Sequence, residues 1–213
     1  LFEAVNRYLA RPVAPADVVW SFSGVRPLLD DEANDLSAVT RDYELVLEAA
    51  DGKAPLLSVF GGKLTTYRRL AEEALALLRD PLGSLQPAWT SGAPLPGGDI
   101  PGADFDRFLL QLSRRHPWLP APLAHRYARA YGTRSDRLLG GASSLGDLGR
   151  EIGDGLYEVE LTYLTRYEWA LTAEDVLWRR SKIGLRASPD TVNRLGEWLA
   201  AHAAAPDRTL QCA

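Results

Sequence analysis

The sequence predicts an α+β chain, with a mixed helix-and-strand region over residues 1–80, a linker over 81–103 and an all-helical domain over 104–213. Helical and strand-like patterns alternate in the first region, glycine and proline crowd the linker, and apolar residues recur at helical spacing beyond it. The 213 residues, of which 46% are hydrophobic, suffice for one large domain or two small ones.

The mixed region is expected to contain a helix over 2–10, strands over 18–23, 43–48 and 54–60, and a helix over 63–79. Residues 43–48 alternate apolar and polar side chains, which is typical of a strand with one face in water. Asp51-Gly52 is a turn signal for a hairpin. Residues 56–60 are nearly all apolar and predict a buried strand.

The helical region is expected to begin with Phe105, Phe108, Leu109 and Leu112, which have helical spacing, and to continue with helices over 121–131, 133–140 and 156–169. Two further helices are predicted to start at Thr172 and at Ser188, where a capping hydroxyl precedes the helix and Pro189 occupies its first position. Trp169 and Trp178 are expected in the core.

Composition excludes several classes of function. The net charge is −4 and the isoelectric point about 5.5, which argues against nucleic acid as a partner. The apolar runs are too short to span a bilayer. The single Cys212 permits no internal disulfide, which favours a reducing, cytoplasmic compartment. The three His and this Cys show no metal-ligand spacing.

The start of the chain predicts a fragment. The sequence contains no Met, and it opens at Leu1 with residues that resemble the middle of a helix. We therefore expect that a preceding segment is missing, and that any function found here belongs to a longer parent protein.

Two arginines are candidates for binding an anion. Arg26 lies in Ser23-Gly24-Val25-Arg26-Pro27, directly after a predicted strand, and Arg41 lies just before another. Strand ends are where α/β proteins place ligands, and the planar guanidinium suits phosphate or carboxylate. The alternative is local pairing, of Arg26 with the acidic cluster 30–32 and of Arg41 with Asp42 or Glu44, which would stabilise little.

A glycine pair opens a third candidate site. Gly61-Gly62-Lys63-Leu64-Thr65-Thr66-Tyr67-Arg68 joins a predicted strand to a predicted helix. The glycines permit close approach of a ligand, and a helix start with Lys63 favours anions. The alternative is a plain strand-to-helix turn in which Thr65 caps the helix. The spacing does not fit a phosphate-binding P-loop.

A short basic run over 178–182 lies in the helical region. It is either a solvated helix face with aromatic anchors or a contact for an acidic surface, such as phospholipid or a partner domain.

These segments together resemble the FAD-dependent, quinone-linked glycerol-3-phosphate dehydrogenases. The resemblance is carried by Ser23–Leu28, Thr40–Tyr43 and Gly61–Arg68, and in the helical region by Leu156–Glu158, Glu168–Ala170 and Asp175–Leu185. It implies the last part of an FAD- and substrate-binding α+β domain, followed by a helical cap. The family's dinucleotide fingerprint and its candidate catalytic His would lie outside this chain.

The resemblance also implies roles for individual residues. Arg26 and Arg41 match phosphate-binding arginines of the substrate site, and Lys63 matches a catalytic lysine beside the flavin. Gly61, Gly62, Leu64 and Thr65, together with Lys63, match the loop that contacts the FAD.

The activity implied is oxidation of glycerol-3-phosphate to dihydroxyacetone phosphate, with electrons passed to quinone. The parent would be peripheral to the inner face of the cell membrane, and a homodimer is one expected assembly. The fragment alone is expected to be inactive and to lack FAD. Two alternatives remain: a helical interaction, dimerisation or membrane-docking domain without catalysis, and a related FAD-dependent amine or amino-acid oxidase-like enzyme.

Overall fold

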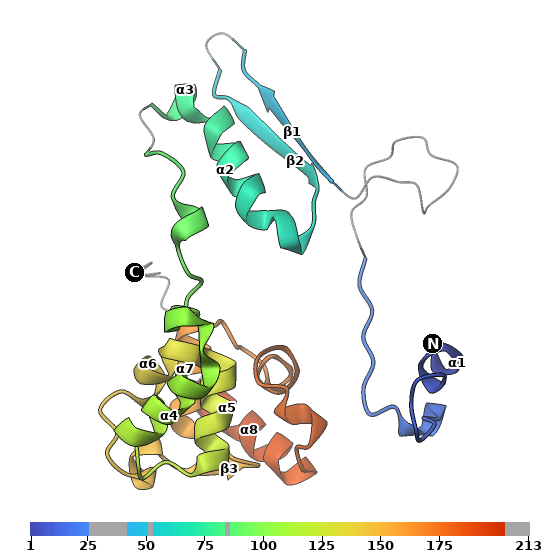
Figure 1. Ribbon diagram of the computed structural model, residues 1–213, viewed down its shortest axis with the longest axis vertical. Helices are drawn as coiled ribbons and strands as arrows, with labels where there is room; N and C mark the ends of the chain where they lie inside the picture. Colours follow the sequence, from blue (N-terminus) through green and yellow to red (C-terminus); the bar gives the residue numbers. More distant parts are fainter. Residues whose placement is uncertain (26–41, 51–52, 84–85, 203–213) are drawn as a thin grey trace. The chain divides into compact units, whose positions relative to one another are not determined.

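The computed structural model describes residues 1–25, 42–50, 53–83 and 86–202 (Figure 1). The chain divides into two compact units. We call Ser21–Pro94 the hairpin unit, and Leu1–Trp20 together with Leu95–Ala213 the helical unit. The boundary at Pro94 falls inside the predicted linker, while residues 1–20 group with the helices rather than with the hairpin.

Two antiparallel strands and one main helix make up the hairpin unit. Strand β1 (Tyr43–Glu48) pairs with β2 (Leu56–Gly61), with Tyr43 opposite Gly61 and Glu48 opposite Leu56. The unit continues through η2 (Leu64–Thr66), α2 (Tyr67–Leu77), α3 (Arg79–Leu82) and η3 (Thr90–Gly92). The bounds of β1 are as predicted, while the helix predicted over 63–79 opens with a separate 3-10 turn. Asp51-Gly52 lies outside the described residues.

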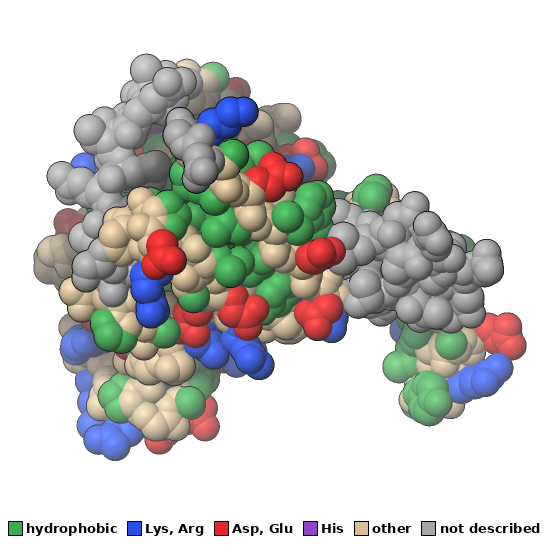
Figure 2. Space-filling model, turned by 90° about the horizontal axis from the view of Figure 1, so that it is seen from above, with side chains coloured by type: hydrophobic (Ala, Val, Ile, Leu, Met, Phe, Trp, Pro, Cys, Tyr) green, Lys and Arg blue, Asp and Glu red, His purple; other side chains and the backbone are tan. Residues whose placement is uncertain are grey.

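The prediction that residues 56–60 are buried is wrong. Leu56 is 58% exposed, Val59 48% and Phe60 46%. A two-stranded sheet has two faces, and the single helix α2 cannot cover both. Figure 2, which looks down on this unit, shows hydrophobic side chains gathered beside acidic ones on its surface.

The N-terminal segment also differs from the prediction. Helix α1 covers only Phe2–Asn6 and is followed by η1 (Pro15–Asp17). Asn6 ends the helix because its side-chain amide exchanges hydrogen bonds of 3.0 and 2.9 Å with the backbone of Val13, which turns the chain back. Residues 18–23, predicted as a strand, form none. Trp20 stacks on Trp178 instead of entering a sheet.

From Leu95 to the last described residue, the helical unit contains five α-helices, which pack around one apolar core. They are α4 (Phe105–Arg115), α5 (Ala121–Tyr131), α6 (Ser135–Leu139), α7 (Glu158–Tyr167) and α8 (Pro189–Ala201). Other helical segments join them: the 3-10 turns η4 (Pro101–Ala103), η5 (Gly132–Arg134), η6 (Leu145–Leu148) and η8 (Ile183–Leu185), and the π-helix η7 (Asp175–Arg180).

Helical periodicity and capping explain these bounds. Leu112, Leu161 and Leu195 are fully buried and come from three different helices. The Ser188 hydroxyl accepts a 3.2 Å hydrogen bond from the backbone N–H of Thr191, which confirms the predicted cap of α8.

The expectation of an all-helical region is wrong in one place. Strands β3 (Glu151–Gly153) and β4 (Leu156–Tyr157) form a small antiparallel hairpin. Its turn is Asp154-Gly155, with both residues at positive φ, and this dipeptide favours tight hairpins. Because β4 takes the first two residues of the predicted helix 156–169, α7 begins at Glu158.

The two tryptophans expected in the core behave differently. Trp178 is partly buried and packs against the core. Trp169 is 66% exposed at a positive φ of 54°, so its predicted burial is wrong. The end of α7 turns the chain outward there, and the small Ala170 occupies the buried position that follows.

Residues that precede α4 also pack into the helical unit. The backbone oxygen of Gly97 accepts a 3.1 Å hydrogen bond from the N–H of Thr133. Gly132 has a φ of +53°, and a Cβ there would lie 1.9 Å from that same Gly97 oxygen. Only glycine fits such a contact, because any side chain would collide with rigid backbone.

Candidate functional site

The two candidate phosphate-binding arginines cannot be placed. Arg26 and Arg41 lie outside the described residues, as does the acidic cluster 30–32 that was the alternative partner of Arg26. Their roles therefore stay predictions. The described part of the candidate site is the corner between β2 and α2.

Two glycines turn the chain at this corner. Gly61 and Gly62 have φ values of 70° and 107°, which most side chains disfavour. A Cβ on Gly62 would lie 3.3 Å from Cδ1 of Leu70 and 3.7 Å from Cβ of Tyr43. Glycine therefore allows α2 to approach the start of β1 closely.

Lys63 and Leu64 follow the turn and point into solvent. Lys63 is exposed with an extended backbone, and Leu64 is 90% exposed. The ion pairs found among the described residues do not include Lys63. An exposed cation and an exposed apolar side chain therefore stand next to a glycine turn with little side-chain cover.

Thr66, rather than Thr65, closes the turn. Its Oγ1 accepts a 3.3 Å hydrogen bond from the Lys63 N–H and donates a 3.1 Å hydrogen bond to the Lys63 carbonyl. The alternative interpretation had given Thr65 this capping role, and it is wrong on this point. Thr65 is exposed and keeps its side chain outside that exchange.

A polar contact connects β1 to α2 next to the corner. The Tyr43 hydroxyl donates a 2.7 Å hydrogen bond to Glu73, and this bond raises the pKa of the Tyr43 phenol. Tyr43 pairs across the sheet with Gly61, so the contact helps hold the glycine turn in place. A shallow hollow beside it is lined by Tyr43, Glu44, Leu45, Glu73, Ala76 and Leu77.

The side chain of Arg68, the last residue of the glycine motif, makes hydrogen bonds within the hairpin unit. It donates to Glu72 at 3.1 Å and to Thr90 at 3.4 Å. The Thr90 hydroxyl also donates to Glu72, and this bond, together with the charge of Arg68, lowers the pKa of the Glu72 carboxyl. These contacts connect η3 to α2.

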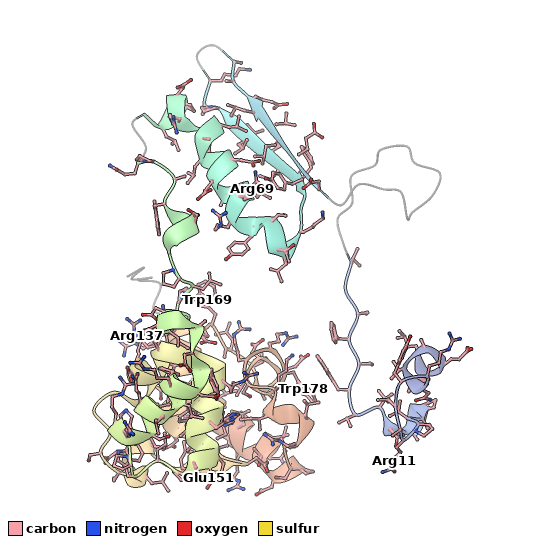
Figure 3. The ribbon with its side chains drawn as sticks, viewed as in Figure 1. Arg11, Arg69, Arg137, Glu151, Trp169 and Trp178 are labelled. Carbon is pink, nitrogen blue, oxygen red and sulfur yellow. The ribbon has the colours of Figure 1, made fainter. Side chains whose placement is uncertain are left out.

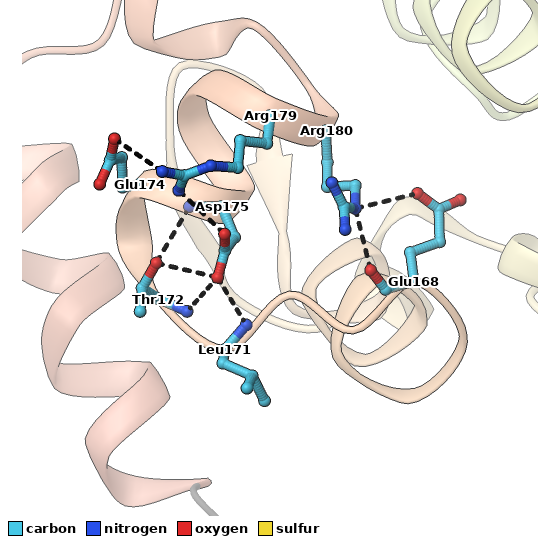
Figure 4. Close-up of polar contacts among 7 residues, drawn as sticks. All are labelled: Glu168, Leu171, Thr172, Glu174, Asp175, Arg179 and Arg180. Atoms are coloured by element: carbon cyan, nitrogen blue, oxygen red, sulfur yellow. Dashed lines mark hydrogen bonds and ion pairs between the residues drawn. The ribbon is translucent and has the colours of Figure 1, made fainter. Parts of the chain in front are cut away.

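The basic run over 178–182 is largely neutralised within its own unit (Figure 4). Arg179 pairs with Asp175 at 2.9 Å and with Glu174 at 3.0 Å. Arg180 donates a 2.9 Å hydrogen bond to the Glu168 carbonyl. Both arginines therefore serve local structure, and Arg179, whose side chain is 50% exposed, fits the interpretation of a solvated helix face. Contact of the run with an acidic surface stays a prediction.

A buried ion pair in the helical unit was missed from the sequence. Arg126 on α5 makes two 2.6 Å bonds to the carboxylate of Glu160 on α7, and a third to the Gly155 carbonyl. The Tyr131 hydroxyl also donates to Glu160. Glu160 stands inside an apolar stretch of sequence, and this was the signal that could have indicated a buried partner.

Electrostatics follow from the burial of this pair. Burial alone would lower the pKa of Arg126, but the hydrogen bonds and charge of Glu160 raise it. Burial and the same carboxylate raise the pKa of the Tyr131 phenol. Glu160 is fully buried and the Arg126 side chain is only 18% exposed, so we assign the pair to stability rather than chemistry.

The described residues offer no other obvious chemistry. They contain no group of three or more His, Cys, Asp or Glu that could hold a metal ion. No helix within them is both long and apolar enough to cross a membrane.

The helical unit decides the family. The sequence model of the C-terminal domain of alpha-glycerophosphate oxidase matches residues 88–205. The chain belongs to this family. Its matched region covers the whole described core of the helical unit, including the buried Arg126–Glu160 pair.

Individual relatives extend the similarity into the hairpin unit. The chain is 53% identical over 199 residues to a glycerol-3-phosphate dehydrogenase of Pseudomonas aeruginosa and 48% identical to the aerobic glycerol-3-phosphate dehydrogenase of Escherichia coli. It is 46% identical to a D-erythritol 1-phosphate dehydrogenase of Brucella abortus. Each comparison covers 93% of this chain but only 39% to 40% of the relative.

Proposed function

We propose that this chain is the C-terminal part of an FAD-dependent sn-glycerol-3-phosphate dehydrogenase. The observation that carries the proposal is the 53% identity to the Pseudomonas aeruginosa dehydrogenase across 93% of the chain. This similarity includes the glycine corner as well as the helical unit. The whole protein would oxidise glycerol-3-phosphate to dihydroxyacetone phosphate.

The glycine corner fits a flat cofactor such as FAD. The two glycines at positive φ leave the backbone uncovered, and exposed Leu64 offers an apolar surface beside it. Gly61, Gly62, Lys63, Leu64 and Thr65 would hold the flavin ring and its ribityl chain. When bound, the flavin would accept a hydride from the substrate.

The chain's own residues would bind and orient. Lys63 would place a positive charge beside the cofactor edge, where charge develops during the reaction. Arg26 and Arg41 would bind the phosphate dianion through planar, charge-assisted hydrogen bonds. Holding the phosphate fixes the direction of the substrate's carbon atoms, which lowers the barrier through orientation.

Replacement of Arg26 tests the substrate role. In the full-length parent, Arg26→Ala should raise KM for glycerol-3-phosphate roughly 10- to 100-fold, because a charge-assisted contact is lost, and should retain the flavin. Arg179→Ala is the matched control, since Arg179 pairs only locally in the described structure. An unchanged KM in Arg26→Ala would reject the role.

Replacement of Lys63 tests the catalytic role. Lys63→Met in the full-length parent should lower kcat more than it raises KM, because its charge acts where the reaction proceeds. Flavin absorbance gives the cofactor content independently. A kcat equal to that of the unmodified parent would remove Lys63 from the chemistry.

D-erythritol 1-phosphate is a second candidate substrate. A relative named for that substrate is 46% identical to this chain, and both substrates are polyol phosphates. Steady-state assays with the two phosphates and with simple amino acids would separate the three options. Preference for an amino acid would favour the amino-acid oxidase-like alternative.

Electron transfer and location form a further part of the proposal. By family resemblance, electrons would pass to quinone, and the parent would be a cytoplasmic protein bound peripherally to the inner face of the cell membrane, as a homodimer. Each point has its own test. Reduction of a soluble quinone analogue tests the electron acceptor, flotation with anionic vesicles tests membrane binding, and the mass in solution tests the homodimer.

The alternative without catalysis concerns the helical unit as an interaction, dimerisation or membrane-docking domain. Its buried core and paired arginines support independent folding. We expect the 213-residue chain by itself to be inactive and to lack FAD. A yellow, active preparation of this chain would contradict that expectation, and a full-length parent that cannot be reconstituted with FAD would favour the alternative.

A further inference from the structure

Three large apolar side chains are exposed close together in the sequence where α7 ends. Tyr167, Trp169 and Leu171 are 44%, 66% and 71% exposed, and Glu168 and Ala170 alternate with them. We call Tyr167, Trp169 and Leu171 the α7 patch. Exposed apolar patches with polar residues around them commonly mark a place where another domain or molecule binds.

The backbone that carries the α7 patch is held on both sides of Trp169. The Ala170 N–H donates a 3.1 Å hydrogen bond to the Leu164 carbonyl, and the Ala170 side chain is fully buried. The Leu171 N–H donates a 3.1 Å hydrogen bond to the carboxylate of Asp175 (Figure 4). The exposure of the α7 patch is therefore a property of an ordered turn and not of a frayed helix end.

Trp169 is directed outward by an uncommon backbone conformation. Its φ is 54°, which few residues with a large side chain adopt. Such strain persists only where the surrounding structure enforces it, and it occurs often at binding sites. The turn after α7 thus presents an indole to solvent at a cost in backbone energy, which indicates a surface shaped for contact.

Two arginines give the α7 patch a positive rim. The guanidinium carbons of Arg137 and Arg166 lie 5.1 and 5.7 Å from the centroid of the Tyr167 ring. Figure 3 shows Arg137 and Trp169 at the same end of the helical unit. The ion pairs among the described residues include neither arginine. Because Trp, Tyr and Arg are enriched at the energetic centres of protein interfaces, this combination favours a protein partner with carboxylates.

Charge argues against two other occupants of the α7 patch. In a symmetric dimer the same patch meets itself, so the arginine rim of one copy would face that of the other. An anionic lipid surface would attract the two arginines by about 1 kcal/mol each. It would repel the chain as a whole, whose net charge is −4.

The remaining occupant is the part of the parent that lies outside this chain. The region aligned with the Pseudomonas aeruginosa dehydrogenase is 39% of that protein, so most of its length has no counterpart here. Domains of one chain commonly meet through interfaces of roughly 600–1,500 Å², which are more polar than the interfaces of obligate dimers. A small apolar patch with a charged rim fits an interface of this kind.

We propose that the α7 patch is the surface on which the helical unit binds the part of the parent outside this chain. Trp169 is its apolar anchor, and Arg137 and Arg166 pair with Asp or Glu of the partner surface. The inference rests on the proposed function because it requires the longer parent, and it adds which side chains join the helical unit to the rest of that protein.

Hydroxyl-radical footprinting tests the α7 patch without changing the protein. Trp169 should be oxidised roughly fivefold more slowly in the full-length parent than in the 213-residue chain, because the core of an interface is shielded from solvent. Leu110, an exposed apolar side chain on α4, gives the reference rate in both proteins. Equal oxidation of Trp169 in the two proteins would overturn the proposal.

The same measurement on the 213-residue chain examines the two other occupants. Protection of Trp169 that develops as the protein concentration rises would indicate a second copy. Protection that develops only with phosphatidylglycerol vesicles would indicate a lipid surface. Either result, combined with an exposed Trp169 in the parent, would refute the proposed occupant.

Charge reversal tests the positive rim. In the full-length parent, Arg137→Glu combined with Arg166→Glu should bring the oxidation of Trp169 within about twofold of its rate in the 213-residue chain, because like charges would then face one another. Arg107→Glu combined with Arg114→Glu reverses two exposed arginines of α4 and is the matched control, which should keep the protection. Protection that survives the reversal at Arg137 and Arg166 would contradict an acidic partner surface.

Footprinting requires neither substrate nor turnover, so this inference and the proposed function can fail separately. A parent that shields Trp169 but does not oxidise glycerol-3-phosphate would refute only the proposed function. A parent that oxidises glycerol-3-phosphate while Trp169 stays exposed would refute only the role of the α7 patch.

Discussion

The helical unit encloses a continuous apolar core, whereas none of the described residues of the hairpin unit is buried. Both units are built from similarly apolar sequence, and they differ in how many layers cover that sequence. In the helical unit, five helical segments face one another. In the hairpin unit, two strands have only one main helix beside them, a combination near the lower limit of independent stability.

This difference shows where a sequence specifies its structure by itself. The helical unit satisfies even a buried charge internally, through Arg126, Glu160 and Tyr131. The hairpin unit leaves Leu56, Val59 and Phe60 half exposed, and apolar patches of this kind commonly mark a surface that another part covers.

The largest effect is expected from breaking the buried ion pair. Glu160→Ala leaves the guanidinium of Arg126 buried without its carboxylate, which should lower the free energy of unfolding by about 3–5 kcal/mol. Urea denaturation of the chain measures the change. Glu174→Ala, which removes one carboxylate of an exposed pair with Arg179, should cost less than ~1 kcal/mol. Equal effects of the two variants would contradict the assignment.

Truncation of an apolar side chain should destabilise the chain more in the helical unit than in the hairpin unit. Leu161→Ala removes a fully buried side chain and should destabilise by about 2–5 kcal/mol. Leu56→Ala removes one that is 58% exposed, and should cost less than ~1 kcal/mol in this chain. Chemical denaturation of the two variants compares them directly. A large cost at Leu56 would mean that the hairpin is covered in solution.

Amide hydrogen exchange should rank the units in the same order. The amides of β1 and β2 should exchange faster than those of α5 and α7, because local opening of the hairpin exposes little additional apolar surface. Mass spectrometry of the deuterated chain measures this. In the full-length parent the hairpin should gain protection, and equal protection in both proteins would contradict the comparison.

The smallest effect concerns pH. The Asp154 carboxylate accepts bonds of 3.0 Å from the Ser188 N–H and 2.7 Å from the Thr191 hydroxyl, and these lower its pKa below the usual 3.8. A lowered folded-state pKa contributes stability that is complete above the unfolded pKa and is lost as pH falls through the folded one. Asp154→Asn should therefore weaken the fall of the unfolding temperature with acidity below about pH 4. Thermal denaturation at a series of pH values measures this. An unchanged dependence would refute the link.

Periodicity and caps predicted the long elements well. The bounds of β1 and α5 agree with those expected from the sequence, and Ser188 caps α8 as predicted. These features depend on local spacing, which a sequence displays directly. The β3–β4 hairpin was not predicted, although Asp154-Gly155 is a turn signal. Its strands are too short to show an alternation of apolar and polar side chains.

Features that depend on distant partners were predicted poorly. The strand expected over 18–23 needed a neighbouring strand, and Trp20 found an aromatic partner instead. The pairing of Arg126 with Glu160 joins positions 34 residues apart. The apolar neighbours of Glu160 could indicate a buried partner, but no local pattern identifies that partner as Arg126. Within the candidate site, the glycine corner lies at the predicted strand end, whereas Arg26 and Arg41 lie outside the described residues.

The contact between Gly97 and Gly132 limits where a shortened chain that contains only the C-terminal helices can begin. A shortened chain that starts at α4, near Asp104, would lack Gly97, whose carbonyl accepts the hydrogen bond from the Thr133 N–H. Such a chain would expose the N–H of Thr133 and leave a gap beside Gly132, where no substitution can fill the space without strain. A portable helical module should therefore retain the residues from Leu95 onward.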